Sequence, residues 1–138
     1  MSSSRAELFV SRFEAAWARP DSGGFAELWL DDGVFIHPTV GSPLTGSEVP
    51  EWSERIKAAM PDFTFRADEW ASRGDLLLLQ WTSTATLGGR SLRYSGVDRF
   101  RLRGWSISEE IVYFDTLEIW AALDPAMVRP ALIDIASS

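Results

Sequence analysis

The sequence contains no cysteine and a single histidine, His37, among its 138 residues. The lack of cysteine excludes disulfides, thiol nucleophiles and zinc–thiolate sites. One histidine cannot form the clusters of several imidazoles on which most catalytic zinc and iron sites depend. A magnesium or calcium site built only from oxygen ligands stays open, although no motif for one is present. We therefore expect neither a bound metal nor a cofactor.

Long apolar runs and positive charge are also scarce. The longest aliphatic run, Leu76 to Leu79, is far too short to span a bilayer, and the start "MSSSRAELF" lacks the apolar core of a secretory signal. The net charge of −7 repels nucleic-acid phosphates. The basic residues Arg99, Arg101 and Arg103 alternate along one strand face without aromatic stacking platforms. We expect a cytoplasmic protein that binds neither membranes nor nucleic acids.

The chain has the composition of one globular domain. Hydrophobic residues make up 46% of it, and no repeat, low-complexity segment or charge block marks a linker. We expect a folded core over about residues 6–123 and a C-terminal tail over residues 124–138.

Helical patterns dominate the first part of the chain. Residues 4–18 carry an apolar stripe at helical spacing, which consists of Leu8, Phe9, Phe13, Ala16 and Trp17. A short second helix is predicted over residues 25–30, and "DDG" is expected to end it before the strand "VFIHP". A third helix is predicted from Ser47, its expected N-cap, to Pro61.

After residue 62 the sequence changes to strand patterns. Glycine-containing turns separate four segments rich in β-branched and aromatic residues: "DFTFRADEWAS", "DLLLLQWTSTATL", "RSLRYSGVDRFRLR" and "ISEEIVYFDTLEIW". Helices followed by an antiparallel meander are typical of an α+β fold. We expect N-terminal helices packed on one curved antiparallel sheet.

Strand periodicity places Asp98 on an apolar face. Side chains alternate between the two faces of a strand, so Asp98 shares a face with Tyr94 and Phe100, whereas the neighbouring arginines share the other. A carboxyl in apolar surroundings has a raised pKa unless a cation or several donors compensate it, and it can then stay protonated and donate a hydrogen bond. The alternative is that Asp98 hydrogen-bonds to the backbone at a bulge near Gly96.

The same periodicity joins Tyr113 and Asp115 on one mostly apolar face of the last strand. Glu109 conflicts with that pattern, and a bulge near "SEE" or a later start of the strand would remove the conflict. Two tyrosines that share inward faces with aspartates indicate polar groups inside an aromatic-lined cavity. The residues expected to contact a substrate in that cavity are Tyr94, Tyr113, Phe13, Trp17, Trp52 and Trp81.

In their order and spacing, these segments resemble the SnoaL-like polyketide cyclase and ketosteroid isomerase branch of the nuclear transport factor 2-like superfamily. The resemblance runs from about Ala6 to Leu123. It rests on a helix followed by "FAELWLDDGVFIHP", "GSPLTG", a helix ending "AAMPDFTF", "DLLLLQWTSTAT", "YSGVDRFRLRG" and "ISEEIVYFDT". It implies a cone-shaped α+β barrel with a deep pocket for a hydrophobic small molecule, commonly as a homodimer.

The resemblance also implies roles for individual residues. His37 falls where ketosteroid isomerases place the aspartate that moves the proton, and Asp98 matches the aspartate that stays protonated and holds the enolate oxygen. Asp115 matches the acid–base aspartate of the polyketide cyclases. Phe13 replaces the oxyanion-hole tyrosine of the isomerases, which argues against steroid isomerisation. Gly96 replaces an arginine of the related epoxide hydrolases, which argues against epoxide opening.

Two functions stay open. The leading hypothesis is proton transfer next to a carbonyl, in a cyclisation or an isomerisation, with His37 as the base. Protonated Asp98, helped by Tyr94 or Tyr113, would then stabilise the enolate. Asp115 can be the base instead, with His37 orienting the substrate. The alternative function is a non-catalytic carrier, sensor or assembly partner, in which His37 only hydrogen-bonds to a loop.

Overall fold

The computed structural model describes residues 2–127 of the chain. Its helices are α1 (Ser3–Ala18), η1 (Pro20–Ser22), α2 (Gly24–Leu28), η2 (Gly46–Glu48), α3 (Val49–Ala59) and α4 (Leu117–Leu123). Its strands are β1 (Trp29–Ile36), β2 (Leu44–Thr45), β3 (Thr64–Arg73), β4 (Leu76–Leu87), β5 (Arg90–Arg103) and β6 (Ser106–Phe114). None of these helices is long and apolar enough to cross a membrane. Most of the predicted C-terminal tail, residues 128–138, lies outside the described residues.

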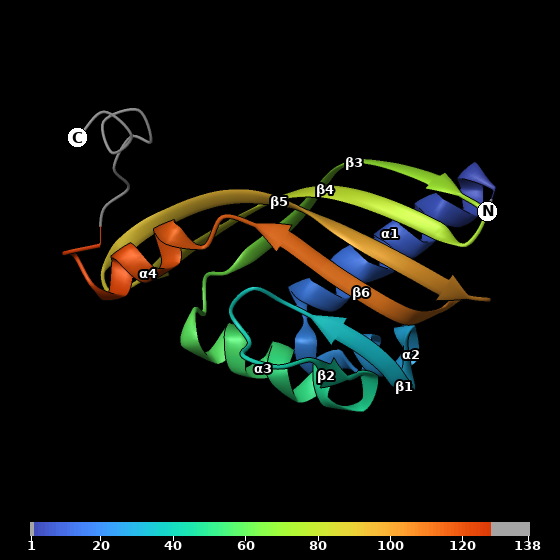
Figure 1. Ribbon diagram of the computed structural model, residues 1–138, viewed down its shortest axis with the longest axis horizontal. Helices are drawn as coiled ribbons and strands as arrows, with labels where there is room; N and C mark the ends of the chain where they lie inside the picture. Colours follow the sequence, from blue (N-terminus) through green and yellow to red (C-terminus); the bar gives the residue numbers. More distant parts are fainter. Residues whose placement is uncertain (1, 128–138) are drawn as a thin grey trace, which may run out of the picture.

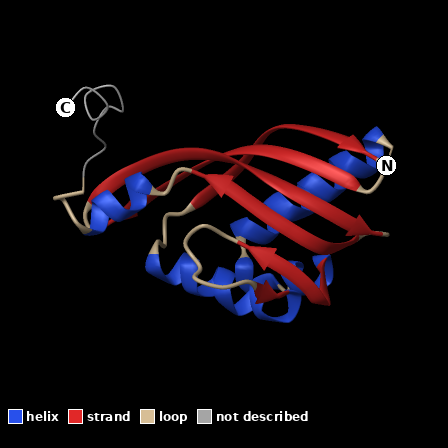
Figure 2. Ribbon diagram, viewed as in Figure 1, coloured by secondary structure: helices blue, strands red, loops and turns tan. Residues whose placement is uncertain are grey.

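The strands form one curved sheet in the order β2-β1-β6-β5-β4-β3, and its two edge strands do not pair with each other, so the sheet stays open (Figure 1). Strands β3 to β6 pair antiparallel, as the predicted meander requires, whereas β1 joins β6 in parallel. Figure 2 shows α1 crossing behind the strands, with α4 at the end of the molecule opposite the N-terminus. The α+β class with helices on a curved sheet is confirmed, with one parallel pairing added.

Helix α1 packs its apolar side against the inner face of the sheet. Phe9 and Phe13 are buried, and their ring centroids lie 5.1 and 5.0 Å from that of Phe100 on β5. Burying each such side chain stabilises the fold by about 1.5–3 kcal/mol. The predicted stripe is confirmed except at Leu8, which is exposed because it lies beyond the edge of the side of the helix that Phe9, Phe13, Ala16 and Trp17 share. The aromatic core therefore lies around Phe100. The part of the inner face nearer to α3 and α4 is left for a cavity.

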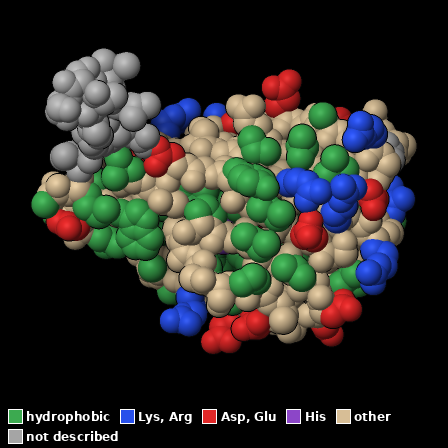
Figure 3. Space-filling model, viewed as in Figure 1, with side chains coloured by type: hydrophobic (Ala, Val, Ile, Leu, Met, Phe, Trp, Pro, Cys, Tyr) green, Lys and Arg blue, Asp and Glu red, His purple; other side chains and the backbone are tan. Residues whose placement is uncertain are grey.

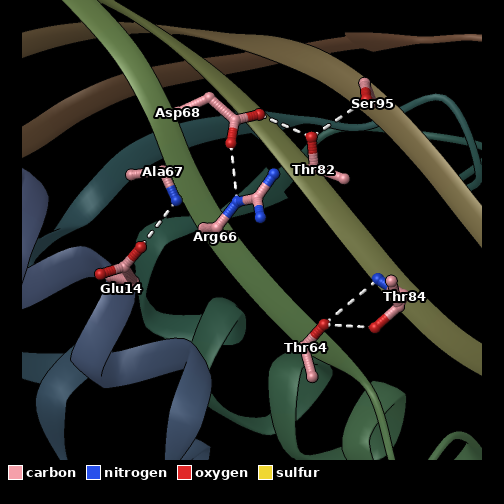
Figure 4. A network of polar contacts seen from close by, with 8 residues as sticks. All are labelled: Glu14, Thr64, Arg66, Ala67, Asp68, Thr82, Thr84 and Ser95. Carbon is pink, nitrogen blue, oxygen red and sulfur yellow. Dashed lines mark hydrogen bonds and ion pairs between the residues drawn. The ribbon is translucent and has the colours of Figure 1, made fainter.

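A bulge in β3 ties α1 to the sheet. The register of β3 with β4 shifts after Ala67 and leaves Asp68 as the extra residue. The backbone N–H of Ala67 donates a hydrogen bond to Glu14 Oε2 of α1 at 2.7 Å (Figure 4). The Asp68 carboxylate accepts hydrogen bonds from Arg66 and Thr82. The bulge thus supplies backbone and side-chain groups that link the helix, β3 and β4.

The predicted boundary between the second helix and the first strand is wrong. Helix α2 ends at Leu28, and β1 begins at Trp29, so "DDG" lies inside the strand instead of before it. The register of β1 with β6 shifts between Trp29 and Val34, which accommodates these residues as a strand irregularity. After this irregularity, residues 34–36 of β1 pair regularly with β6, and the side chain of Phe35 is buried on the inner face of the sheet.

The last predicted strand is shorter than expected. Strand β6 ends at Phe114, and helix α4 follows where the sequence pattern predicted more strand. The carboxylate of Asp115 accepts a hydrogen bond from the backbone N–H of Leu117 at 3.0 Å. This local side-chain to backbone hydrogen bond favours a turn over a continued strand.

The start of the third helix differs from the predicted cap at Ser47. The backbone N–H and the hydroxyl of Thr45 both donate to Glu48 Oε1, at 3.0 and 2.9 Å, and thereby hold the turn of η2 that precedes α3. Gly46 allows this turn to touch β1, because a Cβ there would lie 1.8 Å from the carbonyl oxygen of Leu30. The loop after β1 is therefore fixed, and α3 is held beside the sheet.

Candidate functional site

A cavity of about 250 Å³ lies between the inner face of the sheet, α3 and α4. Its aromatic lining consists of Trp17, Phe35, Trp52, Phe63, Phe65, Trp81, Tyr94, Phe114 and Trp120. Small-molecule sites typically measure ~300–1,000 Å³, so this cavity lies just below that range and suits a small ligand. Rings on most of its walls suit a flat, apolar ligand.

The structure brings most of the predicted site residues together. The cavity is lined by His37, Asp98, Tyr94, Trp17, Trp52 and Trp81. Phe13 is an exception and a correction to the sequence prediction. It is buried in the core, where the rings of Phe25, Phe65 and Phe100 surround it at 5.0–5.8 Å and separate it from the cavity.

Tyr113 and Asp115 lie outside the cavity. Tyr113 is 54% exposed on the outer face of β6, and Asp115 is exposed just beyond the strand. The cause is a bulge at Ser108, where the register with β5 shifts and the Ser108 hydroxyl donates to the carbonyl oxygen of Arg101 at 3.0 Å. One extra residue turns every later side chain to the opposite face. The predicted inward face for Tyr113 and Asp115 is therefore wrong, while the catalytic role of Asp115 stays a prediction.

Asp98 occupies the buried position that strand periodicity predicts. Only 2% of it is exposed, and Trp81 Nε1–H donates a hydrogen bond to its Oδ1 at 2.8 Å. The pairing of β4 with β5 continues unbroken past Asp98, so the alternative of a backbone contact at a bulge is not what the structure shows. Burial raises the pKa of Asp98 to about 6. This carboxyl can therefore change its protonation state near neutral pH.

Sequence reasoning missed Glu110, which the Ser108 bulge turns inward. Glu110 is 3% exposed, lines the cavity and is hydrogen-bonded to the carboxyl of Asp98. The two residues are diagonal neighbours on β6 and β5, since Asp98 lies opposite Val112, two residues beyond Glu110. The conflict of Glu109 with the strand pattern was the sequence signal for this bulge. A bulge at that position, continued through the rest of the strand, places Glu110 on the inner face and turns Tyr113 to the outer face.

The two buried carboxyls share one proton. Among residues 2–127, no lysine or arginine forms an ion pair with either of them. Burial and the nearby charge of Asp98 raise the pKa of Glu110 well above its ordinary value. Glu110 therefore keeps the proton and donates it in a hydrogen bond to the Asp98 carboxylate, which also accepts the Trp81 N–H. The result is a single negative charge at the bottom of an aromatic cavity.

His37 lies directly after β1, and its ring packs against the rings of Trp52 and Phe114 with centroids 4.9 and 5.3 Å away. Its Nδ1 accepts a hydrogen bond from the backbone N–H of Thr39 at 3.1 Å, and the Thr39 hydroxyl lies 2.8 Å from the same nitrogen. A neutral imidazole whose Nδ1 accepts carries its proton on Nε2. Burial lowers the pKa of His37 to about 4, so the ring is neutral at pH 7 and presents an N–H donor.

Tyr94 adds a second neutral donor to the cavity. Its ring stacks on Phe114 at 5.4 Å and meets Trp81 edge-on at 5.8 Å. Burial raises the pKa of Tyr94 to about 12, so the phenol keeps its proton. Gly96 makes this packing possible, because a Cβ there would lie 2.5 Å from Trp81 Cζ2 and 2.8 Å from Phe114 Cβ.

The chain matches a known family of protein domains. The sequence pattern of the SnoaL-like domain matches residues 10–110, which is most of the chain and includes β1 through the inward-turned Glu110. No curated protein sequence matches the chain.

Solved structures of the same fold cover nearly the whole chain. AclR from Streptomyces galilaeus, described as a candidate hydroxylase, has a TM-score of 0.77 at 19% identity and covers 99% of this chain and 91% of its own. IdmH from Streptomyces antibioticus, a candidate polyketide cyclase, has a TM-score of 0.72 at 20% identity, covering 86% and 97%. A Catenulispora acidiphila protein with a ketosteroid isomerase-like fold, solved with trimethylamine, has a TM-score of 0.77 at 19% identity. The match covers 88% of this chain and 97% of that protein. These likenesses show the fold.

Replacing His37 by glutamine should flatten the acid side of the pH–stability curve. Between pH 6.5 and about 4 the unfolded chain binds a proton at this position that the folded chain does not, so the wild type loses stability as the pH falls. The variant lacks this loss, which is about 3 kcal/mol in the free energy of unfolding when complete. Urea unfolding of both proteins across this pH range measures the difference. Parallel curves for the two proteins contradict the burial of a neutral imidazole.

Replacing Glu110 by glutamine should stabilise the protein increasingly as the pH rises. Because folding raises the pKa of Glu110, its contribution is fully present below its ordinary pKa of 4.5 and is lost as the pH rises through the raised value. Glutamine keeps an N–H donor for Asp98 and never ionises. The variant's advantage in the free energy of unfolding should therefore grow with pH in urea titrations. The control is Glu109→Gln on the outer face, and the same trend in both variants contradicts the buried pair.

Proposed function

The chain belongs to the SnoaL-like family, and we propose that its single domain binds a flat hydrophobic carbonyl compound and moves a proton at the carbon next to that carbonyl, in a cyclisation or an isomerisation. The observation that carries the proposal is the buried, hydrogen-bonded carboxyl pair of Asp98 and Glu110 in an aromatic cavity. Such a reaction needs a base that titrates near neutrality and donors where enolate charge develops. The cavity supplies both from its own side chains.

Asp98 is the base in this proposal. Its ionised carboxylate lies at the cavity wall, and its pKa of about 6 is high enough to take a proton yet low enough to leave it ionised at pH 7. Glu110 acts as a positioning residue, because it keeps its own proton and holds the Asp98 carboxylate by a hydrogen bond. The sequence hypothesis gave Asp98 the opposite role, that of a protonated donor. Because Glu110 holds the proton of the pair, Asp98 is the ionised member and is available as the base.

His37 is then the donor that stabilises the enolate. Its Nδ1 lone pair is already engaged by Thr39, and the lowered pKa makes it a weak base at neutral pH. Its Nε2–H, together with the phenol of Tyr94, can donate to the developing oxyanion. Asp98 takes the proton from carbon, and the C–H electrons form the enolate. In an isomerisation Asp98 returns the proton to another carbon. In a cyclisation the enolate carbon attacks a second carbonyl, the C=O π electrons move to that oxygen, and the oxygen takes the proton back from Asp98.

A second candidate is a ligand-binding or assembly module without catalysis. The burial of the two carboxyls favours this candidate. Asp98 and Glu110 are only 2% and 3% exposed, which limits how closely a reacting carbon can approach them. In that case the carboxyl pair would serve only to hydrogen-bond a polar group of the ligand. Binding without turnover distinguishes this candidate from the proposed enzyme.

Hydrogen–deuterium exchange tests the proposed proton transfer without knowledge of the natural substrate. The probe is 2-tetralone, a bicyclic ketone of a size suited to the cavity, followed by proton NMR in D₂O. The wild type should accelerate exchange of the protons next to the carbonyl, with a rate that rises through pH 6, where Asp98 ionises. Asp98→Asn should lower the enzymatic rate by ~10²–10⁴. His37→Gln keeps an N–H donor and should retain part of the rate.

The outcomes separate the candidate bases. If His37→Gln abolishes exchange and Asp98→Asn spares it, His37 is the base, as the sequence first suggested. If Asp115→Asn lowers the rate as much as Asp98→Asn, the base is Asp115. Saturable binding of the probe with no exchange above buffer supports the non-catalytic module. Glu109→Gln, whose side chain lies on the outer face and pairs with Arg99, is the control for a charge change outside the cavity.

We also propose that the protein is a homodimer that associates through the outer face of the sheet. Val34, Ile36 and Tyr113 are 40%, 39% and 54% exposed on the neighbouring strands β1 and β6. On the face seen in Figure 3, hydrophobic side chains spread over the middle of the sheet, and Lys and Arg side chains gather towards one end. Apolar side chains exposed side by side on a sheet face are typical of an interface between copies.

Light scattering coupled to size-exclusion chromatography tests the dimer. Tyr113→Glu places a charge in the middle of the proposed interface and should shift the protein from dimer to monomer. The control is Leu8→Glu, an exposed position on α1 away from that face, which should leave the dimer intact. A monomeric wild type, or dissociation by both variants, contradicts the proposal.

A further inference from the structure

Ser83 carries a buried hydroxyl whose partner is missing. It lies on the inner face of β4, is 1% exposed and lines the cavity. Its Oγ has no hydrogen-bond partner among residues 2–127. The other buried serine of the core, Ser53, donates to the carbonyl oxygen of Pro50 at 2.7 Å, as a buried hydroxyl ordinarily does. Ser83 therefore differs from an ordinary structural serine.

The place of Ser83 on the sheet separates it from the carboxyl pair. Asp98 lies opposite Leu79, which is four residues before Ser83 on β4. At ~3.4 Å per residue, about 14 Å of strand separates the two positions. Trp81 lies between them on the same inner face and lines the cavity. Along β4 the cavity wall thus carries the carboxyl pair, then an indole ring and then a hydroxyl, and it continues to Leu87.

Within the described part of the chain, the surroundings of Ser83 offer its hydroxyl no partner. Its cross-strand neighbours are Phe65 on β3 and Tyr94 on β5, and the ring of Tyr94 stacks on that of Phe114. A buried polar group without a hydrogen bond destabilises the fold, and alanine at this position would remove that cost. Rotation about the Cα–Cβ bond sweeps the hydroxyl across the cavity wall. A ligand atom is the partner that this position can acquire.

We propose that the Ser83 hydroxyl is a second polar contact of the cavity and binds a hydroxyl or carbonyl oxygen at the end of the ligand remote from Asp98 and Glu110. The inference deepens the proposed function and rests on it, because it assumes that the carboxyl end receives the reacting carbonyl. It assigns a substrate class: a flat molecule with oxygen atoms at both ends and an apolar middle that lies over Trp81. The cavity of about 250 Å³ suits two or three rings.

A matched pair of probes tests this contact. 4-Phenylphenol carries one hydroxyl, and 4,4′-dihydroxybiphenyl carries the same rings with a hydroxyl at each end. Binding to the full chain is measured by calorimetry or by quenching of tryptophan fluorescence, with wild type, Ser83→Ala and Ser95→Ala. Ser95 is the control because its hydroxyl lies on the outer face of the neighbouring strand, near that of Thr82. Thermal unfolding without ligand is recorded for each protein.

Ser83→Ala should weaken binding of the diol by about 3- to 10-fold, the usual effect of one neutral hydrogen bond, and leave the mono-alcohol unchanged. The same variant should unfold at the same or a higher temperature, because it loses an unpartnered buried hydroxyl. Ser95→Ala should change neither affinity. A role of Ser83 in shaping the wall alone would weaken both probes equally, and that result overturns the inference.

The result also separates this inference from the proposed function. If Asp98→Asn weakens binding of the mono-alcohol while Ser83→Ala leaves the diol unaffected, the carboxyl site stands and the Ser83 contact is wrong. If neither probe binds the wild type up to its solubility limit, both the contact and the proposed ligand class are wrong. A marked loss of thermal stability in Ser83→Ala would show that the hydroxyl has a structural partner, which also overturns the inference.

Discussion

The hydrogen bond between the carboxyls of Asp98 and Glu110 is the constraint on which the rest of the site depends. Two buried carboxyls without a cation can coexist only when one keeps its proton and the other finds enough donors. Glu110 supplies one donor and the Trp81 indole another. The aromatic walls keep water away and so hold both pKa values above their usual range. The pKa of the proposed base therefore depends on how tightly the rings pack. A more loosely packed wall would admit water to the pair and lower that pKa.

That pair exists because of one extra residue in β6. Without the bulge at Ser108, Glu109 and Tyr113 would face inward and Glu110 would face solvent. The Ser108 hydroxyl stabilises the bulge by donating to the carbonyl oxygen of Arg101. The outward turn of Tyr113 then adds apolar surface to the face proposed for dimerisation. One local irregularity thus sets both the composition of the cavity and the character of the opposite face.

Strand and helix periodicity predicted much of this molecule. The apolar stripe of α1, the four meander strands and the burial of Asp98 follow from local patterns that the structure keeps. His37, which the resemblance singled out, also lines the cavity. The failures lie where a pattern is interrupted, within β1 and at the bulge in β6. A bulge depends on the partner strand as well as on its own residues, so periodicity alone locates a conflict without saying which side chains move. The resemblance gave the family correctly, but the aspartate carried over to position 115 lies outside the cavity.

The charges of the cavity also limit what it can react with. At pH 7 His37 is neutral with its proton on Nε2, Tyr94 keeps its phenol proton, and one carboxyl of the buried pair is protonated. The site therefore holds one negative charge, and the other polar groups around it are neutral. An anionic ligand would enter against that charge and leave its own hydration behind. A neutral ligand avoids this cost, and its negative charge arises only when Asp98 takes the proton and is itself neutralised. The total charge of the cavity then stays constant through the step, which is the condition under which a dry, aromatic site favours proton transfer to form an enolate.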